Sequence, residues 1–134
     1  PKYTNPKISK NIIFNHLYLD FDEDIVLVEG VFDAIKAGYN SVPLLGSTIT
    51  ESSNLFKEIV KNDTPVYLAL DLDARKKANK LIKLFLKYDI EIYDVDISPY
   101  NDVGDMSKKE FIARKSLANV LDVDKYLLNR IRDI

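Results

Sequence analysis

The chain contains 134 residues, of which 46% are hydrophobic and 30% charged, a composition typical of one globular domain. With 19 basic and 21 acidic residues, the net charge of −2 gives no overall attraction to nucleic acid. The chain lacks cysteine and has one histidine, His16, which excludes disulfides and thiolate zinc sites and argues strongly against a Ser-His-Asp triad.

The beginning of the chain has little periodicity and several lysines. Pro1 and Pro6 lie in this segment, and we predict that residues 1–20 form an extended N-terminal arm. Its lysines fit solvated surface, with a contact to nucleic acid as the alternative. The start at Pro1 rather than Met suggests a fragment of a larger polypeptide. No stretch has the ~18–20 apolar residues of a membrane span and no signal peptide is visible, so we predict no membrane contact.

A continuous apolar run, Ile25 to Val28, is stopped by Glu29 and Gly30 and reads as a strand buried on both faces. Further apolar runs predict strands over 41–45, 65–70 and 90–95, and helical spacing between them predicts helices over 32–37, from near Thr50 to Val60, and over 74–87. This alternation predicts an α/β domain with a central, mainly parallel, four-stranded sheet flanked by helices.

Two helices are predicted after the last strand. Ser107 and Glu110 form a capping-box pattern, so a helix should begin there and bury Phe111, Ile112 and Leu117. Asp122 or Asp124 is expected to cap a last helix, which would pack Tyr126, Leu127, Leu128 and Ile131. We therefore divide the chain into the arm (1–20), a catalytic core (21–106) and a C-terminal helical extension (107–134).

Acidic residues follow three of the four predicted strands: Glu29, then Asp71 and Asp73, then Asp102. Because the carboxyl ends of parallel strands share one edge of the sheet, these carboxylates should lie close together. Two like charges about 5 Å apart repel by about 3 kcal/mol at an effective dielectric constant near 20, and a divalent cation removes that penalty. Oxygen ligands without His or Cys favour Mg²⁺ or Mn²⁺. The alternative is that each acid is a separate helix cap or surface charge.

Two short segments have residues of the types that often bind phosphate. Gly46 and Ser47 place a backbone N–H and a hydroxyl in a turn after a strand, although the same residues serve ordinary turns. Lys76 and Lys77 lie near Asp71 and Asp73 at the start of a lysine-rich helix, whose usual role is solubility.

Four segments, taken in order and spacing, resemble the topoisomerase–primase (TOPRIM) domain, a Rossmann-like fold, and most of all that of bacterial and phage DNA primases. They are residues 27–34 (LVEGVFDA), 44–50 (LLGSTIT), 68–74 (LALDLDA) and 102–106 (DVGDM), and the arm resembles the segment that precedes this domain in those primases. The resemblance implies that Glu29, Asp71, Asp73 and Asp102 are the family's metal-site acids, with Glu29, Asp71 and Asp73 catalytic. It also implies that Asp33 matches an acid one helical turn beyond Glu29, and that Gly30 and Gly46 are turn glycines.

The chain departs from the family pattern in two places. Arg75 and Lys76 stand where primases commonly have a small Ala-Gly stretch, and Val103-Gly104 with Asp105 replaces the Asp-Pro-Asp of many members. The role of Asp105 and a second metal ion are therefore open.

The resemblance implies Mg²⁺- or Mn²⁺-dependent synthesis of RNA primers for DNA replication. The partners would be a single-stranded DNA template, ribonucleotides and a replicative helicase, and the place of action the cytoplasm of a bacterial or phage-infected cell. On this interpretation the nucleotide- or phosphate-binding residues are Gly30, Asp33, Gly46, Ser47, Lys76 and Lys77. Two alternatives stay open: a metal-dependent TOPRIM nuclease, and a non-catalytic module that binds nucleic acid or protein.

Overall fold

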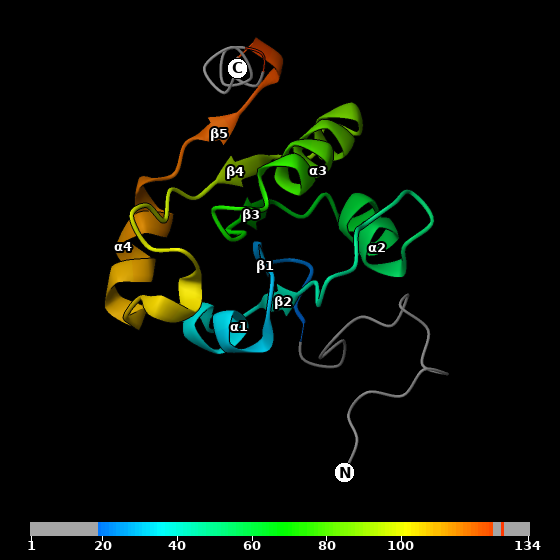
Figure 1. Cartoon of the computed structure of the whole chain (residues 1–134). Coiled ribbons are helices and arrows are strands. Elements are labelled where there is room, and N and C mark those ends of the chain that lie inside the picture. The colour runs from blue at the N-terminus through cyan, green and yellow to red at the C-terminus, as the bar shows by residue number, and fades with distance from the viewer. Residues whose placement is uncertain (1–18, 125–126, 128–134) are drawn as a thin grey trace.

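The structure of the protein is a computed structural model that describes residues 19–124 and Leu127. Its strands are β1 (Ile25–Val28), β2 (Ser41–Pro43), β3 (Val66–Leu68), β4 (Ile92–Asp94) and β5 (Val120–Leu121). They form one sheet in the order β2-β1-β3-β4-β5 (Figure 1). The predicted α/β fold with a mainly parallel sheet is confirmed, but the sheet has five strands rather than four.

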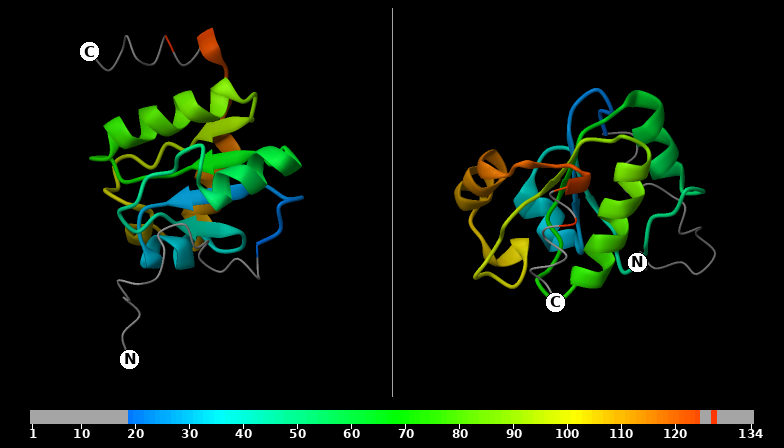
Figure 2. Two further views of the ribbon diagram at one scale, coloured as in Figure 1. Left: turned by 90° about the vertical axis from the view of Figure 1, so that its right-hand side faces the viewer. Right: turned by 90° about the horizontal axis from the view of Figure 1, so that it is seen from above.

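Helices cover both faces of the sheet. They are α1 (Val31–Ala37), α2 (Asn54–Asn62), α3 (Arg75–Lys87) and α4 (Lys108–Leu117), with a short 3-10 helix, η2 (Val103–Asp105). Helices α2 and α3 lie on one face, and α1, η2 and α4 lie on the other (Figure 2). Within the described part of the chain, no helix has the length and apolar character that crossing a membrane requires.

The central strand β1 is buried throughout, as its continuous apolar run predicts. Ile25 and Leu27 pack with the residues of α2 and α3, whereas Val26 and Val28 pack with those of α1 and α4. Because successive side chains of a strand point to opposite faces, each face needs its own apolar set. Each such side chain contributes about 1.5–3 kcal/mol when it is fully buried.

The neighbours of β1 and β3 are parallel, so their carboxyl ends meet at one edge. The last strand, β5, instead runs antiparallel to β4, with Val120 opposite Tyr93. Sequence patterns gave no sign of β5, because two residues are too few to show a strand periodicity.

The predicted helix after Ser107 is α4, and the Ser107 Oγ accepts a hydrogen bond from the Glu110 N–H at 3.0 Å. Phe111 is buried, but the prediction was wrong for Ile112 and Leu117, which are 64% and 74% exposed. Of the residues of α4, Phe111 is the buried one, so the apolar contact of this helix with the sheet is narrow. The predicted last helix falls mostly outside the described residues.

The described part of the chain begins beside β1, where the Asn40 side chain holds it by three hydrogen bonds. The Asp20 N–H donates to the Asn40 Oδ1 at 2.8 Å, and the Asn40 Nδ2 donates to the carbonyl oxygens of Asp20 and Asp24 at 2.7 and 2.9 Å. The predicted arm up to residue 18 lies outside the described residues. The division of the chain at residues 20 and 106 stays a prediction.

Candidate metal centre

Three aspartates that follow different strands come together at the carboxyl edge of the sheet. Asp33, Asp71 and Asp102 each place one carboxylate oxygen within 4.8 Å of the others. Asp33 lies in the first turn of α1, Asp71 lies beyond β3, and Asp102 caps η2. We call this group the aspartate triad.

Asp33 is fixed by the backbone on both sides. Its Oδ2 accepts from the Gly30 N–H at 3.0 Å, and its Oδ1 accepts from the Gly104 N–H at 2.7 Å. The carboxylate is therefore buried but paired, and it joins the start of α1 to the turn at η2. Asp102 is held by the same turn, because its Oδ1 accepts from the Asp105 N–H at 3.0 Å.

Asp71 is the unsatisfied member of the triad. Its Oδ1 is buried and has no hydrogen-bond partner. Burial raises the pKa of the Asp71 carboxyl to about 6, and the negative charges of Asp33, Asp102, Glu29 and Asp73 add to the effect. A buried carboxylate oxygen without a partner is costly, and a hard cation removes that cost. Three carboxylates with no His or Cys among them are a donor set that fits Mg²⁺ or Mn²⁺.

Glycine at position 104 leaves the space that the Asp33 and Asp102 carboxylates need to lie close together. A Cβ there would lie 3.0 Å from the Asp33 Oδ1 and 3.2 Å from the Asp102 Oδ1. Any other residue would push two triad carboxylates apart by a few tenths of an ångström. This close approach, and not a special backbone angle, explains the glycine.

No protein-family model and no curated protein sequence matches the chain. Solved structures do. One match is the structure of the zinc-binding and RNA polymerase domains of the Aquifex aeolicus primase. It has a TM-score of 0.59 and 27% sequence identity over 72% of this chain. The fold is that of a DNA primase TOPRIM domain. A second match, the DnaG primase catalytic domain bound to single-stranded DNA, has a TM-score of 0.60 and 17% identity over 82% of this chain. This chain spans 26% and 37% of those two chains.

Within the TOPRIM domain, the predicted acidic residues divide into two groups. Asp71 and Asp102 belong to the aspartate triad, whereas Glu29 is paired with Lys77, whose Nζ lies 2.8 Å from the Glu29 Oε1. Asp73 is exposed and adds to the negative charge around Asp71 without joining the triad. Asp33, which was predicted to bind nucleotide or phosphate, is the third member of the triad. The signal that pointed to it was its place one helical turn beyond Glu29.

The predicted phosphate-binding residues are spread around this TOPRIM edge. The turn at Gly46 follows β2, with φ of 78° at Gly46, and its neighbour Leu45 donates its N–H to the Glu29 carbonyl at 2.8 Å. Lys76 is exposed and Ser47 is partly buried, whereas the Lys77 ammonium is paired with Glu29. A pocket beside Asp71 lies between the ends of β3 and β4 and includes Arg75, whose guanidinium contacts Asp94 at 2.6 Å.

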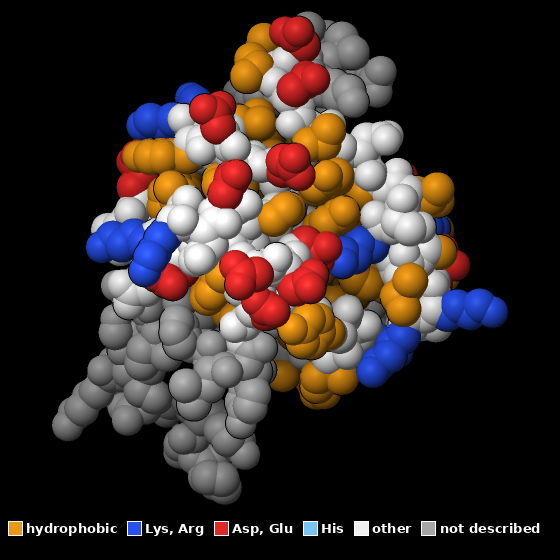
Figure 3. Space-filling view, turned by 180° about the vertical axis from the view of Figure 1, so that it is seen from behind, with side chains coloured by type: hydrophobic (Ala, Val, Ile, Leu, Met, Phe, Trp, Pro, Cys, Tyr) orange, Lys and Arg blue, Asp and Glu red, His pale blue; other side chains and the backbone are white. Residues whose placement is uncertain are grey.

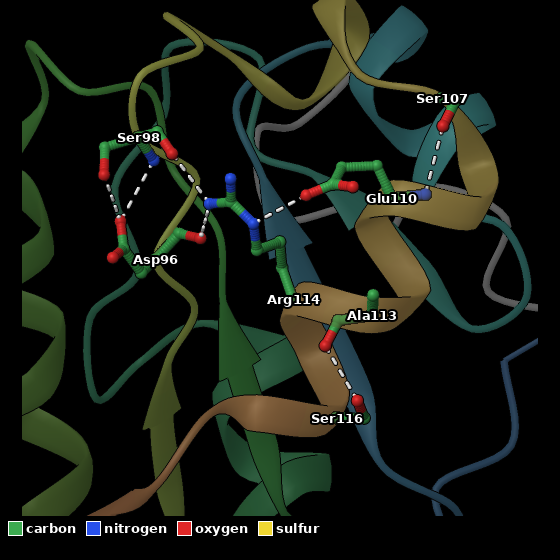
Figure 4. A network of polar contacts seen from close by, with 7 residues as sticks. All are labelled: Asp96, Ser98, Ser107, Glu110, Ala113, Arg114 and Ser116. Atoms are coloured by element: carbon green, nitrogen blue, oxygen red, sulfur yellow. Dashed lines mark hydrogen bonds and ion pairs between the residues drawn. The ribbon is translucent and has the colours of Figure 1, made fainter.

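Arg114 of α4 organises the loop of the TOPRIM domain that leads from β4 towards Asp102. One of its NH groups donates to the carbonyl oxygens of Asp96 and Ser98, each at 2.7 Å, and its Nε donates to Glu110 at 2.8 Å (Figure 4). The Asp96 side chain in turn accepts from the Ser98 N–H and hydroxyl, and the hydroxyl bond is the main cause that lowers the Asp96 pKa. Sequence analysis missed Arg114, and the one signal that could have indicated it is its spacing of four residues from Glu110 on a predicted helix.

We expect Arg114→Lys to weaken Mn²⁺ binding by about threefold to tenfold, because an ammonium lacks the planar fork that holds two carbonyls and a carboxylate together. The loop before Asp102 would then sample more positions. Isothermal titration with Mn²⁺ measures the change. Lys109→Arg, the reverse exchange at an exposed position of the same helix, is the control and should leave Mn²⁺ affinity unchanged. Equal affinities for both variants would contradict a role of Arg114 in placing Asp102.

Proposed function

We propose that the chain is the polymerase module of a DNA primase, which makes RNA primers on a single-stranded DNA template with Mg²⁺ or Mn²⁺. The observation that carries the proposal is the aspartate triad with the unpartnered Asp71 oxygen, in the fold of a primase TOPRIM domain. The neighbour described as bound to single-stranded DNA supports the template as a partner. Because this chain spans a minor part of both neighbours, priming belongs to the longer polypeptide, in the bacterial or phage-infected cytoplasm.

We assign Asp33, Asp71 and Asp102 to hold the cation, with Asp73 at its solvent side. When bound, the cation supplies Lewis-acid stabilisation of negative charge on the phosphates and lowers the pKa of the attacking hydroxyl. Asp33 is held by two backbone N–H groups, so it does not have to move when the site fills. Preorganised carboxylates of this kind lower the cost of arranging the site during reaction.

The remaining roles follow from position along the same edge. Glu29, held by Lys77, is assigned to accept the proton of the 3′-hydroxyl. The Gly30 and Gly46 turns, Ser47 and Lys76 are assigned to nucleotide phosphates, and the pocket beside Asp71 offers room for part of the nucleotide.

The template needs a basic groove, and the residues that the structure describes do not form one on the face opposite to the view of Figure 1. Acidic side chains gather near the middle of that face, and most basic ones are spread around them (Figure 3). A groove that follows the phosphate backbone requires clustered positive charge. We therefore expect other parts of the longer polypeptide to supply it, and a replicative helicase to be a further partner.

The chain should bind Mn²⁺ with a rise of the thermal midpoint but prime poorly alone, and the full-length polypeptide should make ribonucleotide primers on single-stranded DNA. Primer synthesis is measured as labelled ribonucleotide in short products, with Asp71→Asn as the inactive control. Incubation of supercoiled plasmid with the protein and Mn²⁺, without nucleotides, tests the nuclease alternative. Nicking that depends on Asp71, without primer synthesis by the full-length protein, would overturn the primase proposal in favour of a nuclease.

A further inference from the structure

The first turn of α3 carries an unusual concentration of positive charge. Arg75, Lys76 and Lys77 are its first three residues, and the turn has no acidic residue. The amino end of a helix has a positive partial charge, so basic residues there are unfavourable unless a carboxylate compensates. Two of the three are compensated: Arg75 contacts Asp94 and Lys77 contacts Glu29. Arg75 and Lys77 therefore compensate carboxylates at the ends of β4 and β1, and they do not stabilise the amino end of α3.

The Lys77–Glu29 pair differs from a surface ion pair. The two side chains are only 20% and 21% exposed, and their charged atoms are 2.8 Å apart. Glu29 follows β1 directly, so the pair joins the central strand to α3 at the edge where the triad lies. A half-buried pair with this geometry resists screening by salt, and removing one partner leaves the other charge poorly compensated.

Glu29 and Asp71 differ in how their charges are compensated. Among the negative charges that act on Asp71, that of Glu29 is smaller in effect than those of Asp33 and Asp102. Glu29 has an ammonium as its counter-charge, whereas Asp71 has an oxygen with no partner. Within the described part of the chain, an external cation at this edge would be held by the three triad carboxylates, and a second cation near Glu29 would have to compete with Lys77.

We propose that Lys77 is an internal counter-cation of Glu29 that limits the nucleotide-free site to one divalent cation, held by the aspartate triad. The inference rests on the proposed function, because it concerns the metal content of the same site. Lys77 is thus a positioning residue, which acts through Glu29. A second ion then enters only with a ligand that brings its own negative charge, such as a nucleoside triphosphate.

The test is the stoichiometry and affinity of Mn²⁺ binding, measured by electron paramagnetic resonance titration of the nucleotide-free chain. Wild type should bind a single Mn²⁺. Lys77→Met should bind a second Mn²⁺, or bind the first about tenfold more tightly, because Glu29 loses its counter-charge. Lys80→Met removes the same charge from an exposed position one turn along α3 and should stay within about twofold of wild type.

Glu29→Gln provides the second half of a double-mutant cycle. Alone, it should leave the single Mn²⁺ bound, and in the Lys77→Met background it should abolish the added binding. Lys77→Arg keeps the charge and should keep the wild-type stoichiometry, so it serves if Lys77→Met fails to fold by circular dichroism. In that case, a second Mn²⁺ bound by Lys77→Arg would contradict the proposal.

The outcomes separate this inference from the proposed function. If Lys77→Met and Lys80→Met bind Mn²⁺ alike, or if wild type binds two ions without nucleotide, the role of Lys77 is refuted. Should Asp71→Asn still lose Mn²⁺ in that experiment, the metal site of the proposed function stands. If wild type binds no Mn²⁺ at all, both the metal site and the counter-cation proposal are refuted.

Discussion

Asp71→Asn should abolish the Mn²⁺-induced rise of the thermal midpoint and, at the same time, stabilise the metal-free protein above pH 7. The change removes a negative charge from a group whose Oδ1 is buried without a partner. It also relieves repulsion from Asp33 and Asp102, the two negative charges that contribute most to the raised pKa of Asp71. A substitution that destroys the site should therefore increase the free energy of unfolding.

The pH dependence has a definite sign. The pKa of the Asp71 carboxyl is about 6 in the folded protein, above its usual 3.8, so the folded state holds the proton more tightly than the unfolded state. The free energy of unfolding of the metal-free protein should fall as pH rises from about 4 to about 6.5, and then stay level. The shift corresponds to about 3 kcal/mol at most, and solvent around this partly exposed carboxyl reduces the effect to about 1–2 kcal/mol.

Urea unfolding in EDTA at pH 5 and pH 8 measures this effect. Asp71→Asn should exceed wild type at pH 8 by about 1–2 kcal/mol, with a smaller gain at pH 5. Asp73→Asn, an exposed change two residues away, is the matched control and should gain less than half as much. A metal-free Asp71→Asn protein that is less stable than wild type at pH 8 would show that Asp71 has a partner in solution.

Asp33→Asn should have the opposite effect on stability although it removes the same charge from the same triad. Both Asp33 oxygens accept backbone N–H groups, from Gly30 and Gly104. An asparagine has one acceptor oxygen, so its amide nitrogen must face one of those N–H groups. The unsatisfied donor costs about 1–3 kcal/mol, and Mn²⁺ binding should be lost as well.

Urea unfolding of both variants in one EDTA buffer at pH 8 gives the order Asp71→Asn, wild type, Asp33→Asn, from most to least stable. Asp105→Asn, in the same turn as Gly104 but exposed, should stay within about 0.5 kcal/mol of wild type. If Asp33→Asn proves as stable as wild type, Asp33 does not join α1 to the η2 turn in the way that its two hydrogen bonds indicate.

Much of the fold follows from local sequence pattern. The apolar run from Ile25 to Val28 predicts a buried strand because every residue faces one of two helix layers. The acids that follow β1, β3 and β4 lie at one edge of the sheet because these three strands run parallel to one another. Fold class and the approximate location of the site can therefore be read without coordinates.

The membership of the site depends on contacts between distant segments, which the pattern does not contain. Asp33 joins the triad because the η2 turn packs against α1 and offers it the Gly104 N–H. Lys77 reaches Glu29 because α3 starts beside the end of β1, a matter of helix placement. Whether Glu29, Asp73 and the Gly46 turn act in the reaction stays a prediction.

Helical periodicity also placed side chains in the core that lie outside it. Ile112 and Leu117 were predicted to be buried with Phe111 on one face of the helix after Ser107, yet they are 64% and 74% exposed. Periodicity marks an apolar face but does not say which neighbour covers it.

The hydrogen bond between Asp33 and Gly104 joins residues 71 positions apart. The triad therefore exists only after the elements between these two residues, from β2 to β4, have assembled, so a peptide that lacks any of them should have no cation affinity. It also means that an ion bound there stabilises the assembled sheet as a unit. Native-state amide exchange should accordingly slow in β1 and β3 as well as at the edge loops when Mn²⁺ is added, which makes the ion a reporter of complete folding.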